Sequence, residues 1–259
     1  MKRSLLPIMG LLAAGGCSRL ETIPYTPPVT PGTWCSLHHC VTVNTGPLDF
    51  ILTTPSSSAI VFLLGFATLG VALYFLRIRE GSRSRLWWGI GLLLWSAATF
   101  FAGISYQAFG YEIKCAGREV CRWTSWWEVM YLILMIPALS SLLIAEAYSC
   151  VAPAKRRVSF IIAAAIPVIH TGIMLAGALL PDRFLMSFEM MVMFAAPFIL
   201  YFLVLNTWRY IRFRNTMDLA LAGATALLIL TLAAYFWCLV SGLTQKMWDG
   251  GRGIWFSDN

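Results

Sequence analysis

A few polar side chains that could carry chemistry lie within or beside long apolar stretches of the sequence. An ionisable group in lipid is costly, so each one is a candidate functional residue. We expect Ser105 and Glu128 as catalytic candidates in an enzyme. In a receptor or permease, the candidates for binding a ligand or a proton are Gln107, Glu128, His170 and Glu189. The alternative is a hydrogen-bond network in which these groups only satisfy one another.

Two further acidic side chains have a different expected environment. Glu146 follows Glu128 by 18 residues, so on one continuous helix the two would share a face at a spacing of about 27 Å. Glu146 and Asp218 each lie next to a segment rich in arginine. We therefore expect both to form ion pairs with those arginines.

Cysteine and histidine occur together in the segment Cys35-Ser36-Leu37-His38-His39-Cys40. Neighbouring side chains cannot easily reach one metal ion, so we expect no metal site here and favour a disulfide. With Cys115 and Cys121, four cysteines precede or separate the apolar stretches. Four cysteines allow three pairings, which sequence cannot distinguish. Our working hypothesis is the two local pairs.

The elements that must position these residues are membrane helices. Of the 259 residues, 59% are hydrophobic and only 12% are charged, and the mean hydropathy is +0.73. Soluble domains carry about 25% charged residues, so the lipid bilayer is the expected partner. The net charge of +7 comes from short clusters between apolar runs, which argues against nucleic acid. A lipid or another small molecule is the expected ligand, and the oligomeric state stays open.

Six apolar segments are each long enough to cross a bilayer, which predicts an all-α, polytopic helix bundle. Their approximate bounds are 58–77, 86–106, 125–148, 158–180, 186–206 and 217–241. Arginine and lysine concentrate in the connections 77–85, 149–157 and 207–216, whereas the other two connections mix both signs. The positive-inside rule then places the three basic connections in the cytoplasm and the N-terminus outside. We expect a multi-pass protein of a bacterial inner membrane.

The N-terminal segment 1–17 has the features of an export signal. Lys2 and Arg3 precede a ten-residue apolar stretch that is too short to span the bilayer. The residues before Cys17 resemble a bacterial lipobox, except that Ala14 replaces the usual leucine, so Cys17 is a candidate for lipidation. An uncleaved anchor is the alternative. Residues 18–57 are rich in proline and threonine, which predicts an extended extracytoplasmic lead-in.

The C-terminal segment 242–259 contains Trp248, Trp255 and Phe256, aromatic residues that often mark the start of another membrane helix. Two alternatives stay open: a short external tail, or the start of a seventh span that this chain lacks. No lysine lies inside the six predicted spans, so this chain offers no Schiff-base partner for retinal.

The arrangement of Ser105 and Glu128 resembles the CREST group, seven-helix membrane proteins that include alkaline ceramidases and progestin/adiponectin receptors. That group carries Ser-x-x-x-His at the end of span two, an Asp at the start of span three, and His-x-x-x-His in span seven. Ser105 and Glu128 occupy the matching places, but Phe109 replaces the first histidine and Glu128 replaces the aspartate. The resemblance implies a zinc-dependent hydrolase of lipid amides, provided that a missing seventh span supplies histidine ligands.

Two classes of function follow. Because the chain shows no hydrolase, nucleotide-binding or zinc-protease motif, we favour a receptor, sensor or permease-type bundle with a polar cluster in the outer leaflet. The alternative is the CREST-like hydrolase, in which Ser105 would orient the substrate and Glu128 would act as a base or hold metal-bound water.

Overall fold

The computed structural model describes residues 19–20, 22–23, 25–38, 40–44 and 49–243. The predicted export signal, the lipidation candidate Cys17 and most of the segment 242–259 lie outside the described residues, so those predictions stay untested.

The described chain is built on six helices that are long and apolar enough to cross a membrane, as the sequence predicted. They are α3 (Pro55–Arg77), α4 (Arg83–Ala102), α6 (Trp126–Cys150), α7 (Arg156–Leu179), α8 (Phe188–Phe213) and α9 (Thr216–Val240). The apolar helix α4 continues into η1, a π-helical segment (Gly103–Ala108), and η2 (Pro153–Lys155) leads into α7. This arrangement supports an integral, multi-pass membrane protein.

Serine caps set the starts of several helices. The side chains of Ser82, Ser125 and Ser187 each accept a hydrogen bond from a backbone N–H in the first turn of α4, α6 and α8. These caps satisfy backbone donors that a helix leaves free at its N-terminus. They also fix where the helices begin, within a few residues of the positions that the hydropathy pattern predicted.

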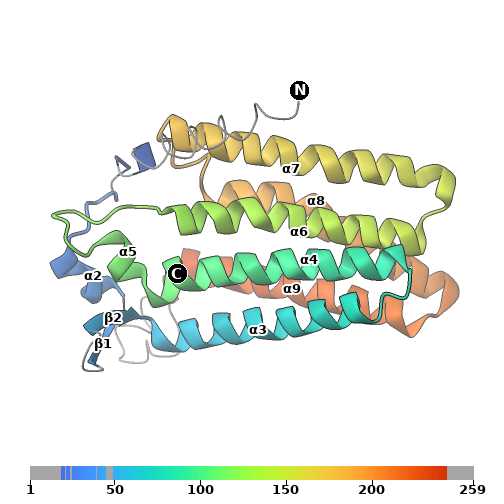
Figure 1. Cartoon of the computed structure of the whole chain (residues 1–259), viewed down its shortest axis with the longest axis horizontal. Helices are drawn as coiled ribbons and strands as arrows, with labels where there is room; N and C mark the ends of the chain where they lie inside the picture. Colours follow the sequence, from blue (N-terminus) through green and yellow to red (C-terminus); the bar gives the residue numbers. More distant parts are fainter. Residues whose placement is uncertain (1–18, 21, 24, 39, 45–48, 244–259) are drawn as a thin grey trace.

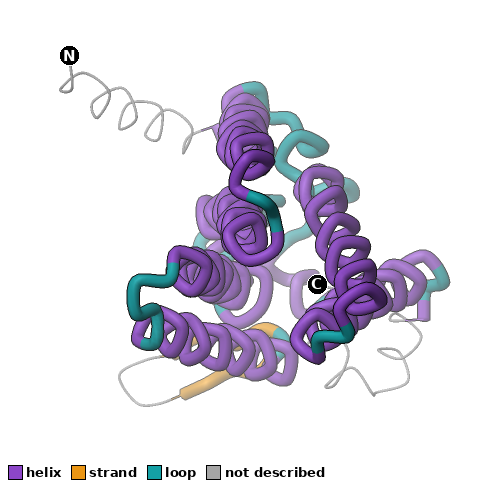
Figure 2. Tube along the Cα trace, turned by 90° about the vertical axis from the view of Figure 1, so that its right-hand side faces the viewer, coloured by secondary structure: helices purple, strands orange, loops and turns teal. Residues whose placement is uncertain are grey.

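Helix α6 lies at the centre of the bundle. Two thirds of its apolar window (67%) is buried, against 11% for α3 and 6% for α9. Figures 1 and 2 show α6 between α4 and α7, with α3 on the far side of α4. Helix α8 packs on α6, and α9 packs on α8. Most of the surface of α3 and α9 therefore faces the surroundings, as expected for helices in contact with lipid.

Two glycines allow α4 to approach its neighbours closely. A Cβ atom at Gly89 would lie 2.6 Å from Leu76 of α3, and one at Gly91 would lie 2.6 Å from Leu142 of α6. The Cβ of Gly91 would also lie 3.1 Å from the carbonyl oxygen of Ala138. Small residues at helix contacts let the backbones pack at short range, which drives helix association in membranes.

A small folded cap covers one end of the bundle, which we call the hairpin end. It contains α2 (Pro31–Leu37), the antiparallel strands β1 (Cys40–Asn44) and β2 (Asp49–Thr53), and α5 (Gly110–Lys114). The expectation of an extended lead-in was therefore wrong for this part. The Cys35–Cys40 disulfide ties α2 to β1, Trp34 is buried, and the backbone N–H of Ile51 donates to Glu112 at 2.9 Å. These contacts with α5 outweigh the extended preference of the prolines.

Both local cysteine pairs of the working hypothesis lie at disulfide distance. Cys35 pairs with Cys40, and Cys115 pairs with Cys121. The second bridge closes the connection between α5 and α6 and is fully buried.

The opposite end of the bundle, which we call the basic-loop end, holds the α3–α4, α6–α7 and α8–α9 connections (Figure 1). The described parts of the three arginine-rich connections thus lie at one end of the bundle, and the hairpin and both disulfides lie at the other. The charge pattern predicted this arrangement, with the three basic connections on one side and the cysteine-rich segments on the other.

Candidate functional site

A buried ion pair lies at the hairpin end. The Nζ of Lys114, at the end of α5, lies 2.5 Å from Oε1 of Glu128 in the first turn of α6. The side chains of both residues are at most 5% exposed. The ammonium also donates to the Tyr25 hydroxyl at 3.4 Å and to the carbonyl oxygen of Trp123 at 3.3 Å. Three partners match the three N–H donors of a lysine.

Two serines complete this Lys114–Glu128 cluster. Ser105, in the π-helical segment η1, donates to Glu128 Oε1 at 3.0 Å. Its oxygen lies 2.6 Å from that of Ser125, which must then donate the proton of this bond because Ser105 has only one. Ser125 in turn caps α6 by accepting from the backbone N–H of Glu128 at 3.4 Å. The helix cap and the ion pair thus belong to one network.

The electrostatics of the cap favour a charged lysine. Burial by itself lowers the pKa of Lys114, but the adjacent Glu128 carboxylate and the Tyr25 hydroxyl outweigh it, so the pKa lies above its usual value. Burial raises the pKa of Tyr25, and the Lys114 charge counteracts only part of that rise. The ring of Tyr106 lies 5.2 Å from Nζ and that of Trp34 lies 6.0 Å from it. These rings add cation–π attraction in a desolvated setting.

This cluster is closed rather than open. The ammonium has its full set of partners, and the cluster lies under the aromatic rings of the cap. No residue of the cluster lines either of two cavities that lie between the long helices. Of the alternatives open at the sequence level, the Ser105–Glu128 pair matches the mutually satisfied network best.

The other predicted site residues have different surroundings. Gln107 accepts from the Thr54 hydroxyl at 2.7 Å, and Glu189 is exposed in the first turn of α8. His170 is fully buried in α7 with its ring 5.1 Å from that of Phe194. Neither of its ring nitrogens has a hydrogen-bond partner among the described residues. The structure therefore joins Ser105 and Glu128 but does not bring the five residues into one site.

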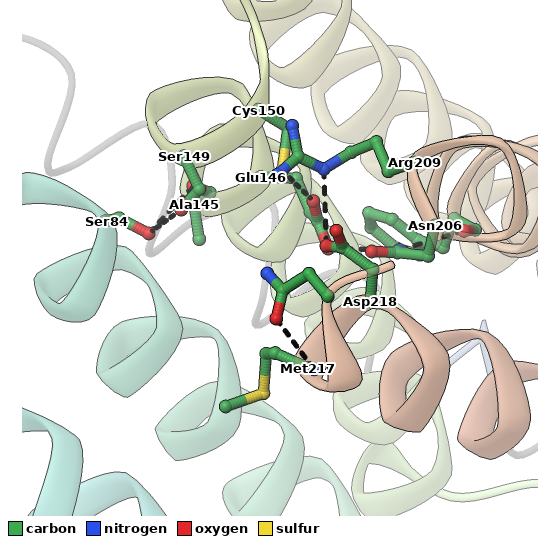
Figure 3. A network of polar contacts seen from close by, with 11 residues as sticks. Ser84, Ala145, Glu146, Ser149, Cys150, Asn206, Arg209, Met217 and Asp218 are labelled. Carbon is green, nitrogen blue, oxygen red and sulfur yellow. Dashed lines mark hydrogen bonds and ion pairs between the residues drawn. The ribbon is translucent and has the colours of Figure 1, made fainter. Parts of the chain in front are cut away.

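A second polar cluster lies at the basic-loop end, where α6, α8 and α9 meet (Figure 3). Glu146 is 2% exposed and Asn206 is 1% exposed, and the Asn206 amide donates to Glu146 Oε1 at 3.2 Å. The Cys150 thiol donates to Glu146 Oε2 at 3.1 Å. Asp218 pairs with Arg209 across 3.2 Å, as the sequence predicted. Glu146 was also expected to form an ion pair with an arginine, and that was wrong. Among the described residues its hydrogen-bond donors are an amide and a thiol, and Arg209, which bonds to Asp218, interacts with Glu146 only electrostatically.

The Glu146 cluster borders a cavity of about 170 Å³ between α4, α6, α8 and α9. Its walls are mainly apolar and aromatic, and Glu146, Asn206 and Thr225 are the polar residues among them. The remaining lining residues are Trp88, Trp95, Leu139, Leu142, Ile199, Phe202, Leu221, Ala224 and Leu228. A cavity of about 200 Å³ between α6, α7 and α8 is apolar apart from Ser159 and Tyr201.

An oxygen atom near this cavity is left without a hydrogen-bond donor. The side-chain nitrogen of Asn206 donates both to Glu146 and to the carbonyl oxygen of Phe202, the latter at 2.9 Å. These two acceptors identify which end of the amide is the nitrogen and which is the oxygen. Its Oδ1 atom then has no partner among the described residues, and neither has Oδ2 of Asp218. Buried polar atoms are nearly always satisfied, so each exception calls for an explanation.

Sequence reasoning missed Lys114 and Asn206. Lys114 belongs to a connection that mixes both signs of charge, so its sequence position alone does not indicate burial. Asn206 stands in an apolar stretch and carries no charge, so it was passed over. Within the described ranges, no three histidine, cysteine or acidic side chains gather in a way that could hold a metal ion.

The comparisons with known proteins add no relative. No family model, no curated protein and no solved structure matches this chain. What can be said of its function therefore rests on the geometry above.

Proposed function

We propose that this integral membrane protein is a receptor or permease-type bundle that binds an amphiphilic small molecule. Its site is the cavity between α4, α6, α8 and α9. The observation that supports this is the pairing of an apolar cavity with two buried polar side chains, Glu146 and Asn206, on its wall. Ligand sites commonly have mainly apolar walls and a few convergent polar groups that set orientation.

This proposal moves the ligand site away from the place that the sequence favoured. Glu128 was the first choice, but its carboxylate already pairs with Lys114 and accepts from Ser105. A ligand there would have to displace a buried ammonium, which costs several kcal/mol. Glu146 has only neutral donors, so it is the more available acidic group.

We propose the orientation that the charge pattern indicates, with the hairpin end outside the cell and the basic-loop end in the cytoplasm. The Glu146 cavity would then open near the inner leaflet. Reporter fusions after Arg79, Lys155 and Arg212 are expected to read cytoplasmic, because each position lies within a basic connection. Fusions after Gly117 and Asp182 are expected to read external, and one robust reversal among the five would contradict this orientation.

Ligand binding in the cavity can be tested by filling it. Thr225 of α9 lines the cavity, whereas Leu227 on the same helix is 66% exposed. The probes are 1-decanol, decylamine and decyltrimethylammonium, and the readout is the thermal unfolding temperature of the full chain in lipid nanodiscs. We expect at least one probe to raise this temperature saturably, because a ligand that binds only the folded state stabilises it.

Thr225→Trp is expected to abolish that rise, and the matched control Leu227→Trp is expected to keep it, because its indole would face lipid. Non-specific partitioning of the probe into the nanodisc would affect both variants equally, so a difference between them reports binding in the cavity. The proposal fails when none of the three probes stabilises the protein, or when Thr225→Trp responds like the wild type.

A CREST-like hydrolase remains the second proposal, because Ser105 and Glu128 lie within hydrogen-bond distance at 3.0 Å, as its active site would need. That enzyme would also need Glu128 released from Lys114, and zinc ligands from residues beyond those described. Zinc-dependent cleavage of a lipid amide that is lost in Glu128→Gln would favour it over the ligand-binding bundle.

A further inference from the structure

The ligand of the Glu146 cavity can be assigned a chemical class. Resting on the function proposed above, we infer that the occupant is a cationic amphiphile whose primary ammonium group lies against Glu146 and Asn206. Its alkyl chain lies along the apolar walls. Charge, hydrogen bonding and shape each lead to this class.

The charge of the cluster calls for a cation. Among its contacting members, Glu146 and Asp218 are acidic and Arg209 is basic, and Arg209 pairs with Asp218. Arg156, which is near in sequence, uses its guanidinium on the carbonyl oxygens of residues 147, 148 and 151 at the end of α6. Glu146 is thus left with an amide and a thiol, two neutral donors. Arg209 also interacts electrostatically with Glu146, but it is already paired with Asp218, so two acidic side chains share one cation. A ligand cation would complete the charge balance of this buried cluster.

The hydrogen bonds call for N–H donors. The described atoms without a partner in this cluster, Oδ1 of Asn206 and Oδ2 of Asp218, are both acceptors. The Asn206 amide cannot turn over to offer a donor, because its nitrogen already serves Glu146 and Phe202. A primary ammonium brings three donors, whereas a quaternary ammonium brings none. The ligand must therefore carry N–H groups as well as charge.

The shape of the cavity calls for a chain. A volume of about 170 Å³ is below the roughly 300–1,000 Å³ of sites that enclose a whole drug-sized ligand. It holds a head group and its first methylenes. Trp88, Trp95 and Leu139 are among the apolar residues that line it. A small inorganic cation would leave these apolar walls without a partner, so an alkyl ammonium fits the whole cavity better.

The three decyl probes separate these requirements, because they share a chain and differ only in the head group. Dissociation constants are taken from the concentration dependence of the unfolding temperature. We expect decylamine to bind at least tenfold more tightly than 1-decanol, and also more tightly than decyltrimethylammonium. Hydrogen bonds to charged groups contribute more than neutral ones, which is the reason for the expected ratio.

Two variants test the assigned atoms. Glu146→Gln removes the charge. Asn206→Leu removes the unpartnered oxygen together with the amide that donates to Glu146 and Phe202. Each is expected to reduce the preference for decylamine to below threefold. Binding of 1-decanol should change little, which shows that the cavity is intact in each variant. Because the three probes are also compared in the wild type, the inference stays testable even where a variant does not fold.

The outcomes separate this inference from the proposed function. Equal affinity for decylamine and 1-decanol overturns the cationic class while the ligand-binding function stands. Equal affinity for decylamine and decyltrimethylammonium overturns the requirement for N–H groups. If sodium or potassium chloride stabilises the protein as much as decylamine does, the requirement for an alkyl chain is overturned. Replacing phosphatidylcholine in the nanodisc by phosphatidylethanolamine shows whether the bound ammonium group belongs to a membrane lipid or to a free amine. Competition with decylamine supports a lipid head group, and no competition supports a free single-chain amine.

Discussion

Glu128→Gln is expected to lower the free energy of unfolding by about 3–5 kcal/mol, the usual cost of removing one partner from a buried ion pair. The substitution leaves the Lys114 ammonium in a desolvated cap without its counter-charge. Ser105 also loses the charged acceptor that it now reaches at 3.0 Å. The measurement is reversible unfolding of the full chain in mixed micelles, followed by circular dichroism.

Glu189→Gln is the matched control. Glu189, like Glu128, lies in the first turn of its helix, so both carboxylates interact with the helix dipole in the same way. Glu189 is exposed and Glu128 is 1% exposed, so burial is the difference between the two. We expect the control to change stability by less than about 0.5 kcal/mol. Equal losses in both variants would contradict the structural role of the ion pair.

A double variant separates the ion pair from simple loss of volume. Replacing both charges by apolar residues of similar size is often nearly neutral. Lys114→Met with Glu128→Leu should therefore be more stable than either single substitution. The interaction energy of the pair is the loss in the double variant minus the sum of the losses in the two single variants, and it is zero when the losses are additive.

The pH dependence of stability follows from the same pair. The pKa of Lys114 is raised on folding above its ordinary value of 10.5, so the folded state holds this proton more tightly than the unfolded state. The stabilisation is therefore complete below that ordinary value, and it is lost as the pH rises through the folded pKa. Tyr25, also raised above its ordinary value, acts in the same alkaline direction. In the double variant the Lys114 contribution to this alkaline loss should be absent.

Gly91→Leu is expected to lower the free energy of unfolding by about 3 kcal/mol, the upper part of the range for overpacking a core. Its Cβ alone would lie 2.6 Å from the Leu142 side chain and 3.1 Å from the Ala138 carbonyl oxygen. The isobutyl group of leucine would clash with these atoms unless α4 and α6 move apart. Since α6 is the central helix, their separation weakens the whole bundle.

Gly172→Leu provides the control. A Cβ atom at Gly172 of α7 would meet no described atom within 4 Å. Leucine is also a better helix former than glycine by almost 1 kcal/mol, so this variant should be neutral or slightly stabilised. The same unfolding assay applies, and a tolerated Gly91→Leu would show that α4 and α6 do not depend on this close contact.

Several features of this protein could be predicted from the sequence because each depends on residues that are close together in the chain. The six helices follow from the hydropathy of stretches of about 20 residues, and hydropathy is independent of which neighbours a helix meets. The sequence left three disulfide pairings open, and the local hypothesis matches the structure because the paired cysteines are only five and six positions apart, so the chain itself keeps them close. Two membrane helices separate each basic connection from the next, so the three basic connections must lie at the same end of the bundle.

The partners of the polar side chains were decided only by the tertiary structure. Glu128 meets a lysine from the preceding connection, whereas Glu146 meets an asparagine 60 positions away. Which side chains face each other depends on the rotation of each helix about its axis and on its depth in the bundle. Both are set by packing, such as the close approach at Gly91, and neither is encoded in hydropathy. The cavity beside Glu146 exists because four helices leave that space between them, and no single segment of the sequence specifies it.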